Sequence, residues 1–246
     1  MMSLNFSKKS TSSAQMDAMG GSVVLSQEMP WAIQEAYNAL RTNIIFSMPG
    51  MNGKSKVIGV TSALPSEGKS INAINTAASF AQLGKSVLVI DADMRLPTVA
   101  SKVGMTREEG LSGVLVGECT ILDAIVHNDK LNMDILPSGK IPPDATKLMQ
   151  SRQMGLLISA LRKSYEYIFI DLPPVTTVAD AAIMSEYIDG FLLVVKHAST
   201  DVRAINEMVS ELRFANANIL GFVYNGADTG KKGGKYYKNY SSYYSK

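Results

Sequence analysis

The stretch VTSALPSEGKS, residues 60–70, has the residue types and spacing of a phosphate-binding loop. It follows the pattern G-x-x-x-x-G-K-[ST], with Ala63 in place of the first glycine. Backbone N–H groups in such a loop point at an anion where a helix begins. Lys69 would reach the β- and γ-phosphates of a nucleotide, and Ser70 would ligate Mg²⁺. The predicted nucleotide-binding residues of this loop are Ser66, Glu67, Gly68, Lys69, Ser70 and Ile71.

Acidic residues follow two further apolar runs of the chain. The run VLVI precedes Asp91 and Asp93, and the run IFI precedes Asp171. A carboxylate at the end of a buried strand is costly unless a cation lies nearby, and Mg²⁺ and Lys69 are the obvious partners. An aspartate in such a place can also cap the next helix or turn. Two acidic strand ends together with the loop favour a site for a nucleotide and Mg²⁺.

Strands and helices alternate along the chain after a first helix that Pro30 opens. Apolar runs predict strands over 56–61, 86–90, 132–136, 167–170, 191–195 and 219–224. Helices are expected over 69–83, 112–116, 121–126, 147–163, 179–187 and 201–215. Continuous apolar strands between helices predict an α/β fold, with a mostly parallel sheet flanked by helices on both faces. The carboxyl ends of such strands share one edge, where ligands bind.

Composition limits the class of protein. The 246 residues suffice for one large α/β core, and the net charge of +2 gives no reason to expect a nucleic-acid partner. The single cysteine fits a reducing compartment. No apolar run approaches the roughly 20 residues that span a bilayer, so we expect a cytoplasmic protein. The predicted organisation is a flexible arm over 1–28, a nucleotide-binding domain over 29–228, and a flexible tail over 229–246.

Four segments together resemble the bacterial tyrosine kinases. VLVIDADMR resembles their D-x-D-x-R motif, YIFIDLPP their second acidic motif, and TSALPSEGKS their variant phosphate loop. KIPPDATKLMQS resembles their P-P-x-x-x-x-L-x-x-S segment. The resemblance covers roughly residues 30–246. It is to the cytoplasmic kinases of capsular or exopolysaccharide synthesis in Gram-positive bacteria, which have a P-loop NTPase fold.

The resemblance implies an autophosphorylating protein-tyrosine kinase that uses ATP and Mg²⁺. Lys69 would stabilise charge on the transferred γ-phosphoryl group. Asp91 and Asp93 would lie beside that group, one holding the metal and the other orienting or deprotonating a tyrosine hydroxyl. The sequence does not distinguish these two roles, and we take Asp93, with Ser70 and Asp171, as the candidate metal ligands.

Two further residues are candidate nucleotide contacts. Arg95 lies two residues past Asp93 and could contact phosphate or form an ion pair with a neighbour. Asn225 follows the last predicted strand and could read the adenine edge. It could also be a turn former, because Asn-Gly is a strong turn pair.

Half of the ten tyrosines lie in the tail, within the segment KYYKNYSSYYS. The nearby lysines, glycines and serines predict a flexible segment. A sticky aromatic tail or a basic–aromatic nucleic-acid contact is the plainer interpretation. The resemblance implies instead that these are autophosphorylation sites, where each phosphate adds about −1.5 to −2 charge. The sites would be Tyr236, Tyr237, Tyr240, Tyr243 and Tyr244.

The first helix and the tail together suggest an assembly. EAYNALR resembles the E-x-x-R-x-x-R segment with which the family builds a ring of subunits. Glu35 and Arg41 match it, whereas Asn38 replaces the middle arginine. The resemblance implies a ring-like homo-oligomer in which a tail enters a neighbour's active site. It also implies a transmembrane activator that recruits the kinase to the inner face of the plasma membrane, and a cognate tyrosine phosphatase.

Two other functions are compatible with parts of the sequence. The first is a non-kinase, dimerising ATPase of the chromosome-partitioning or division-site type. Those ATPases carry a second lysine early in the loop, and residues 62–66, SALPS, contain none. The second is a non-enzymatic adaptor whose tail is phosphorylated by another kinase.

Overall fold

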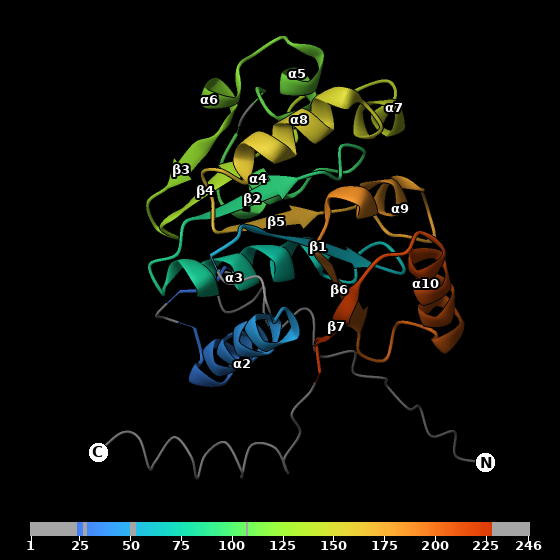
Figure 1. The fold of residues 1–246 in the computed structure, drawn as a ribbon. Coiled ribbons are helices and arrows are strands. Elements are labelled where there is room, and N and C mark those ends of the chain that lie inside the picture. The colour runs from blue at the N-terminus through green and yellow to red at the C-terminus, as the bar shows by residue number, and fades with distance from the viewer. Residues whose placement is uncertain (1–23, 27–28, 50–52, 107, 228–246) are drawn as a thin grey trace, which may run out of the picture.

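The computed structural model of the chain describes residues 24–26, 29–49, 53–106 and 108–227. These residues form three layers, in which a sheet lies between two groups of helices (Figure 1). The tyrosine cluster and most of the expected N-terminal arm lie outside the described residues. No helix in the described ranges is long and apolar enough to cross a membrane.

The sheet of the described residues has seven strands in the order β3-β4-β2-β5-β1-β6-β7. Six of them run parallel, and β3, at one edge, pairs antiparallel with β4. The strands are β1 (Lys56–Ser62), β2 (Val87–Asp91), β3 (Val126–Asn128), β4 (Met133–Leu136), β5 (Tyr167–Asp171), β6 (Gly190–Lys196) and β7 (Ile219–Asn225). The prediction of a mostly parallel α/β sheet is confirmed, and the arrows of β1, β2 and β5 point the same way in Figure 1.

Helices cover both faces of the sheet, and each group of helices closes its own apolar core. One face carries α3 (Lys69–Ala81) and α4 (Val99–Lys102), with α2 (Trp31–Ser47) packed on α3. The other face carries α5 (Leu111–Val116), α6 (Ile121–Ala124), α7 (Ala145–Met149), α8 (Arg152–Leu161), α9 (Asp180–Met184) and α10 (Val202–Phe214). A 3₁₀ turn, Ser185–Tyr187, follows α9.

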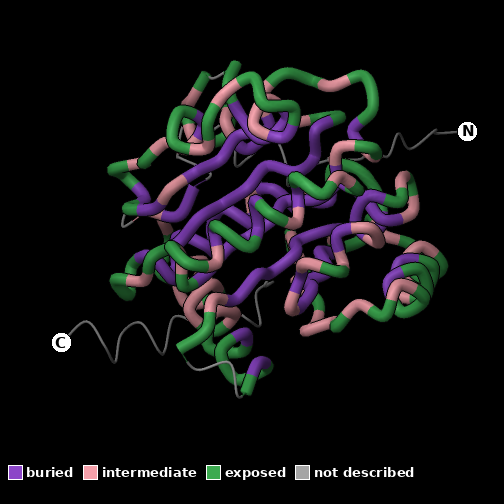
Figure 2. The backbone as a smooth tube through the Cα atoms, turned by 45° about the horizontal axis from the view of Figure 1, so that its top comes forward, coloured by how far each residue is buried: buried purple, intermediate pink, exposed green. Residues whose placement is uncertain are grey.

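The central strands are buried along their whole length because helices cover both of their faces. Every residue of β1, β2 and β5 is buried, and these strands form the buried centre in Figure 2. Alternate residues enter opposite cores: Ile58 and Val60 face α3, whereas Val57 enters the core of the other face. The continuous apolar runs of the sequence therefore reflect two-sided burial.

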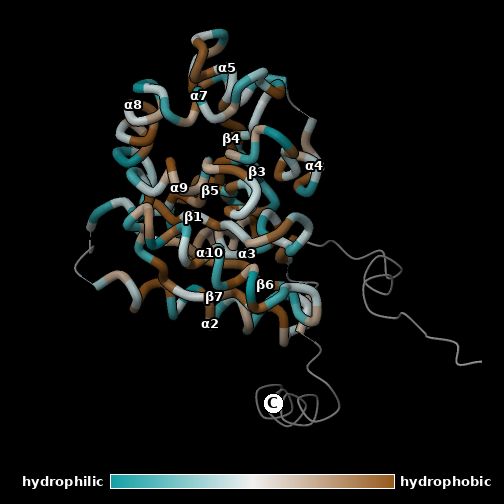
Figure 3. The backbone as a smooth tube through the Cα atoms, turned by 90° about the vertical axis from the view of Figure 1, so that its right-hand side faces the viewer, coloured by the Kyte–Doolittle hydropathy of each residue, from teal (hydrophilic) through white to brown (hydrophobic). Residues whose placement is uncertain are grey.

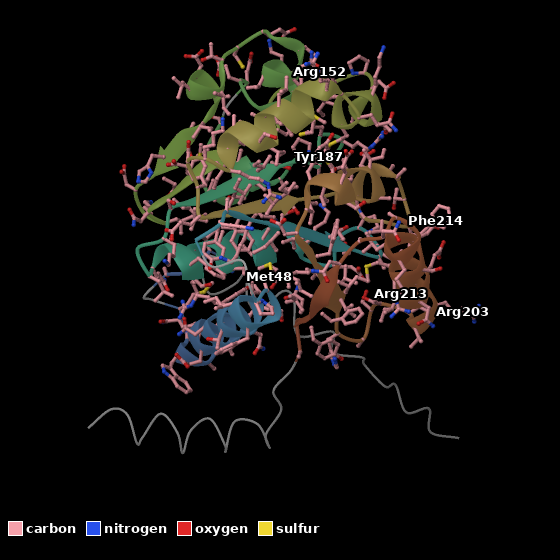
Figure 4. All side chains as sticks on the ribbon, in the orientation of Figure 1. Met48, Arg152, Tyr187, Arg203, Arg213 and Phe214 are labelled. Atoms are coloured by element: carbon pink, nitrogen blue, oxygen red, sulfur yellow. The ribbon has the colours of Figure 1, made fainter. Side chains whose placement is uncertain are left out.

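Hydrophobic residues concentrate in the central strands, whereas the outer helices mix hydrophobic and hydrophilic residues (Figure 3). In α10 the side chains of Met208 and Leu212 are buried. Arg203, Arg213 and Phe214 lie on its solvent side (Figure 4), and Phe214 is 90% exposed. Met208 and Leu212 thus lie on the face of α10 that packs on the sheet.

The structure differs from the predicted helices at three places, one of which is the helix expected over 179–187, where α9 ends at Met184 and a 3₁₀ turn follows. The helix expected over 147–163 is two helices, α7 and α8, because the Ser151 hydroxyl accepts a hydrogen bond from Met154 N at 3.3 Å and starts a new helix. The helix expected over 121–126 ends at Ala124, and Val126 begins the edge strand β3. At Ser151 the apolar pattern continues across a break that a polar side-chain contact creates.

The described part of the N-terminal arm is packed. Val24 and Leu25 are buried against α3, and Leu25 N donates to Asn75 Oδ1 at 2.7 Å. This differs from the expectation of a flexible arm over 1–28, since two of its residues belong to the core.

One partly buried contact fixes the amino end of β1, the strand that leads into the phosphate loop. Arg162, just after α8, donates from both Nη atoms to the Asp189 carboxylate, at 2.8 and 3.1 Å. The same guanidinium binds the carbonyl oxygens of Ser55 and Tyr187. Asp189 Oδ2 also accepts from Val57 N at 2.7 Å. Arg162 therefore joins α8, β1 and the entry to β6.

We expect Arg162→Lys to lower the free energy of unfolding by about 1–3 kcal/mol, because lysine cannot reproduce the two-pronged contact with Asp189. Urea denaturation measures this loss. Lys163→Ala, at the exposed neighbouring position, is the matched control and should change stability by less than about 0.5 kcal/mol. Equal losses in the two variants would show that the Arg162 contact has no special role.

Candidate active site

The predicted phosphate loop runs from the end of β1 to the start of α3. Ser66 and Gly68 adopt positive φ angles of 63° and 94°, which turn the chain so that α3 can begin at Lys69. A Cβ at Gly68 would lie 2.1 Å from Asn225 Nδ2, so both the backbone angle and the space require glycine. The loop thus has the strand–turn–helix geometry that presents N–H groups to an anion.

The Glu67 side chain holds this loop in shape. It is 2% exposed, and its carboxylate accepts from Leu64 N at 3.0 Å and from the Thr200 hydroxyl. Both oxygens are therefore used inside the protein. Glu67 can contribute its backbone N–H to a nucleotide, while its carboxylate ties the loop to the turn after β6. Sequence reasoning did not identify Thr200.

Asn225 and Lys196 also contact the loop. Asn225 Nδ2 donates to Glu67 O at 2.9 Å, and Lys196 Nζ lies 3.4 Å from Ser66 O. The ends of β6 and β7 therefore support the loop from one side. Asn225 lies against the loop as expected, and its amide nitrogen is engaged there by a backbone carbonyl. Its adenine role stays a prediction.

Lys69 is the cation of the site and is surrounded by carboxylates. Its Nζ donates to Asp93 Oδ2 at 2.6 Å and lies 4.0 Å from Asp171 Oδ1. All three side chains are buried. Burial acts to lower the pKa of Lys69, but the charges of Asp171 and Asp93 outweigh it and raise the pKa above its usual value. Lys69 is therefore held as an ammonium ion.

Asp91 and Asp171 lie side by side on neighbouring strands, because the register of β2 and β5 pairs them. Burial, followed by the charge of Asp171, raises the pKa of Asp91. Burial likewise raises the pKa of Asp171, and Lys69 opposes the shift. Fully ionised, three aspartates and one lysine would leave two negative charges uncompensated in a buried place. The site therefore favours a ligand that brings positive charge.

Asp91, the last residue of β2, and Asp93, two residues further on, also organise the turn that follows. Asp91 Oδ2 accepts from the backbone N–H groups of Thr98 and Val99, at 3.1 and 3.0 Å. Asp93 Oδ1 accepts from Leu96 N at 3.1 Å. These aspartates therefore bind backbone N–H groups of the next turn, as a cap does, and also line the site. α4, which Asp91 caps, was not predicted from the sequence.

Mg²⁺ fits the oxygen atoms that remain. Asp91 Oδ1 and both Asp171 carboxylate oxygens are buried and have no hydrogen-bond partner among the described residues. Within the described residues no three acidic, histidine or cysteine side chains could hold a metal by themselves. Mg²⁺ keeps several waters and shares one or two carboxylates with substrate phosphates, so these unpaired oxygens are the atoms it would use.

The remaining predicted site residues are Ser70, Arg95 and Ile71. The Thr98 hydroxyl donates to Ser70 Oγ at 2.9 Å, so the turn after β2 reaches the predicted metal ligand. Arg95 forms an ion pair with Asp180 and a hydrogen bond with Thr146. Ile71 packs against the core on the α3 side, so its backbone is the part available to a nucleotide. Sequence reasoning singled out none of Thr98, Thr146 and Asp180, although Thr146 lies at a variable position of the P-P-x-x-x-x-L-x-x-S segment.

The predicted oligomerisation residues lie elsewhere, on α2. Arg41 Nη1 donates to Ser79 O of α3 at 2.5 Å, and Asn38 Nδ2 donates to Glu35 Oε1 at 2.8 Å. Both predicted residues are thus engaged within the chain. Arg41 helps to dock α2 on α3, and the ring stays a prediction.

Fold and site together define a class of protein. A parallel sheet, a glycine-lysine-serine loop leading into a helix and buried aspartates at neighbouring strand ends are the features of a P-loop nucleotide-binding protein.

Comparison with known proteins then gives the family. The family described as AAA domain matches residues 55–219. The tyrosine-protein kinase YwqD of Bacillus subtilis is 36% identical over 197 residues, covering 80% of this chain and 82% of YwqD. The crystal structure of the chimerical protein CapA2B2 has a TM-score of 0.79 and 33% identity, covering 84% of this chain and 91% of its own. The chain belongs to the family of bacterial tyrosine-protein kinases.

The septum site-determining protein MinD of Pyrococcus horikoshii shares the fold alone. Its structure, complexed with Mg-ADP, has a TM-score of 0.59 and 23% identity, covering 69% of this chain and 70% of its own. The predicted family, fold and enzyme class are therefore confirmed, and the non-kinase ATPase alternative is not favoured.

We expect Asp171→Asn to stabilise the nucleotide-free protein and to remove its response to Mg²⁺. Removing one buried negative charge should raise the melting temperature of the nucleotide-free protein by about 2–4 °C, the shift that about 1 kcal/mol gives a chain of this size. The same change should abolish the gain in melting temperature that Mg²⁺ adds to ADP. Differential scanning calorimetry with ADP, with and without Mg²⁺, measures both effects. An undiminished Mg²⁺ effect would exclude Asp171 from metal binding.

Proposed function

We propose that this chain transfers the γ-phosphoryl group of Mg-ATP to tyrosines of its own C-terminal cluster, and that this controls the synthesis and export of a capsular or exopolysaccharide. The observation that carries the proposal is the buried contact between Lys69 and Asp93 beside Asp91 and Asp171. It supports phosphoryl transfer because this reaction needs charge neutralisation and an in-line nucleophile more than it needs covalent chemistry.

The proposed step forms a bond between a tyrosine oxygen and the γ-phosphorus. The bond from that phosphorus to the bridging oxygen breaks, and ADP leaves with the electron pair. Lys69 neutralises charge that develops on the phosphoryl oxygens. The tyrosine proton passes to one of the two carboxylates at the end of β2.

The proposed cofactor is Mg²⁺, which neutralises phosphate charge when it is bound. The residues that would hold it are Ser70, Asp171 and one of the β2 aspartates. Asp93 is the candidate from the sequence, whereas Asp91 Oδ1 is the oxygen that has no hydrogen-bond partner among the described residues. The loop N–H groups from Ser66 to Ile71, with Arg95 and Asn225, would hold the nucleotide.

The proposed acceptors are Tyr236, Tyr237, Tyr240, Tyr243 and Tyr244, which lie outside the described residues. A neighbouring subunit's active site would receive them in a ring-like homo-oligomer. We further propose a transmembrane activator that recruits this kinase to the inner face of the membrane, and a cognate tyrosine phosphatase that removes the phosphates. The family relation supports these partners, and the net charge of +2 gives no support to a nucleic-acid partner.

The outer surface of α2 supports the oligomer. Phe46 is 77% exposed, and Ile45 and Trp31 on the same helix are 41% and 39% exposed. Ile45 and Phe46 are neighbours near the carboxyl end of α2, whereas Trp31 is its first residue, and exposed apolar side chains on one surface helix favour a protein contact. Arg41 would then orient α2 from within the subunit, since it bonds Ser79 O of α3, whereas Glu35 bonds Asn38 on its own helix.

Incubation with Mg-ATP should produce a phosphotyrosine signal that Lys69→Met abolishes, because the variant loses the cation that meets the γ-phosphoryl group. Replacing the five tail tyrosines with phenylalanine should remove most of the signal while nucleotide affinity stays within about twofold, since the tail lies outside the nucleotide site. Western blotting and titration with a fluorescent ADP analogue measure the two quantities. ATP hydrolysis without tyrosine labelling would instead indicate a non-kinase ATPase. Labelling only after addition of another kinase would indicate an adaptor.

Sedimentation tests the assembly. The full chain should form an oligomer at high concentration, and Phe46→Asp should shift it toward monomer, because a buried carboxylate would be unpaired in the contact. Leu122→Asp, which changes another highly exposed apolar residue far along the chain on α6, is the matched control. A monomer at every concentration, with and without an activator, would contradict the ring.

A further inference from the structure

Arg95, Thr146 and Asp180 form a closed network at the edge of the active site. Arg95 Nε donates to Asp180 Oδ2 at 3.2 Å, and Arg95 Nη2 donates to Thr146 Oγ1 at 2.7 Å. The Thr146 hydroxyl in turn donates to Asp180 Oδ1 at 2.8 Å. Thr146 is therefore an acceptor for the guanidinium and a donor to the carboxylate, so each member of the network contacts both others.

The network joins three segments that follow three parallel strands. Arg95 lies in the turn after β2, Thr146 lies at the start of α7 after β4, and Asp180 begins α9 after β5. These strands are neighbours in the sheet, so their carboxyl ends meet at the edge that carries the aspartates. Residues from three separate loops thus converge on one arginine.

The turn that carries Arg95 is tied to the centre of the site. Leu96 N, the next backbone group, donates to Asp93 Oδ1, while Asp93 Oδ2 accepts from Lys69. Thr98, two residues further on, donates to Ser70. The Arg95 backbone is therefore fixed beside the lysine and the predicted metal ligand, and the Asp180–Thr146 pair fixes the other end of the side chain.

Burial and charge show which member is the support and which is available to a ligand. The Asp180 side chain is 1% exposed and has both oxygens bonded inside the protein, whereas Arg95 is 42% exposed. Among the described residues, Arg95 Nη1 has no hydrogen-bond partner. A guanidinium held on one edge and open on the other is suited to bind an anion.

We propose that Thr146 and Asp180 are positioning residues, which hold Arg95 so that its open edge meets the phosphoryl group as it passes from ATP to tyrosine. The inference rests on the proposed kinase function and adds two residues to it. Asp180 fixes the plane of the guanidinium through Nε, and Thr146 fixes its rotation through Nη2. Without Thr146 and Asp180, Arg95 would keep its charge, but its side chain would have to become ordered each time the transition state forms.

Thr146 provides the sharper test because it does not touch the nucleotide loop. Thr146→Val keeps the shape of the side chain but removes the hydroxyl, and it should lower the maximal rate of autophosphorylation about tenfold while KM for ATP stays within about twofold. Thr146→Ser keeps the hydroxyl and should restore most of the rate. Thr106→Val, at an exposed loop position, is the matched control and should leave the rate unchanged. If Thr146→Val does not fold, Thr146→Ala tests the same loss of hydroxyl with a smaller side chain.

A double-mutant cycle separates positioning from a merely structural role. If Thr146 acts through Arg95, adding Thr146→Val to Arg95→Gln should cause little further loss of rate. Independent, multiplying losses would overturn the inference, as would a Thr146→Val variant with the rate of the unaltered chain. A failure of the unaltered chain to label its tyrosines would overturn the proposed function itself, and the inference with it.

Discussion

The rest of the site depends on the buried contact between Lys69 and Asp93. It places an ammonium ion at the end of the phosphate loop with an excess of carboxylates around it. Burying this many like charges is unfavourable without a compensating cation, and the raised pKa values of Asp91 and Asp171 are the sign of that cost. The fold thus leaves an excess of buried negative charge that a divalent cation would offset.

Each neighbouring turn is built on one of these charged groups. Asp91 caps the segment that starts α4, and the Thr98 hydroxyl in that segment reaches Ser70. Glu67 serves the same purpose on the other side, where Thr200 holds its carboxylate and with it the loop. The residues that would handle phosphate are therefore also the residues that shape the backbone around it. This coupling explains why the loops can be short and still hold the lysine and aspartates in place.

Much of the fold and of the candidate site could be predicted from the sequence. The apolar runs before Asp91 and Asp171 predicted parallel strands with acidic ends, and the loop pattern predicted Lys69 and Ser70. What the sequence did not indicate are contacts between segments far apart in the chain, such as Thr200 with Glu67 or Asp180 with Arg95, because no local spacing encodes them. The break at Ser151 was missed for the opposite reason, since a single hydroxyl interrupts a helix while the apolar period continues through it.

The central claim is that this charged site transfers phosphate to the chain's own tyrosines. The most direct measurement is the intact mass of the full chain after incubation with Mg-ATP, followed by peptide mapping of the added groups. The account predicts added phosphates that map to the tyrosines between 236 and 244, and none on the Lys69→Met variant. Consumption of ATP with no gain in mass, or phosphates that map outside the tyrosine cluster, would contradict it.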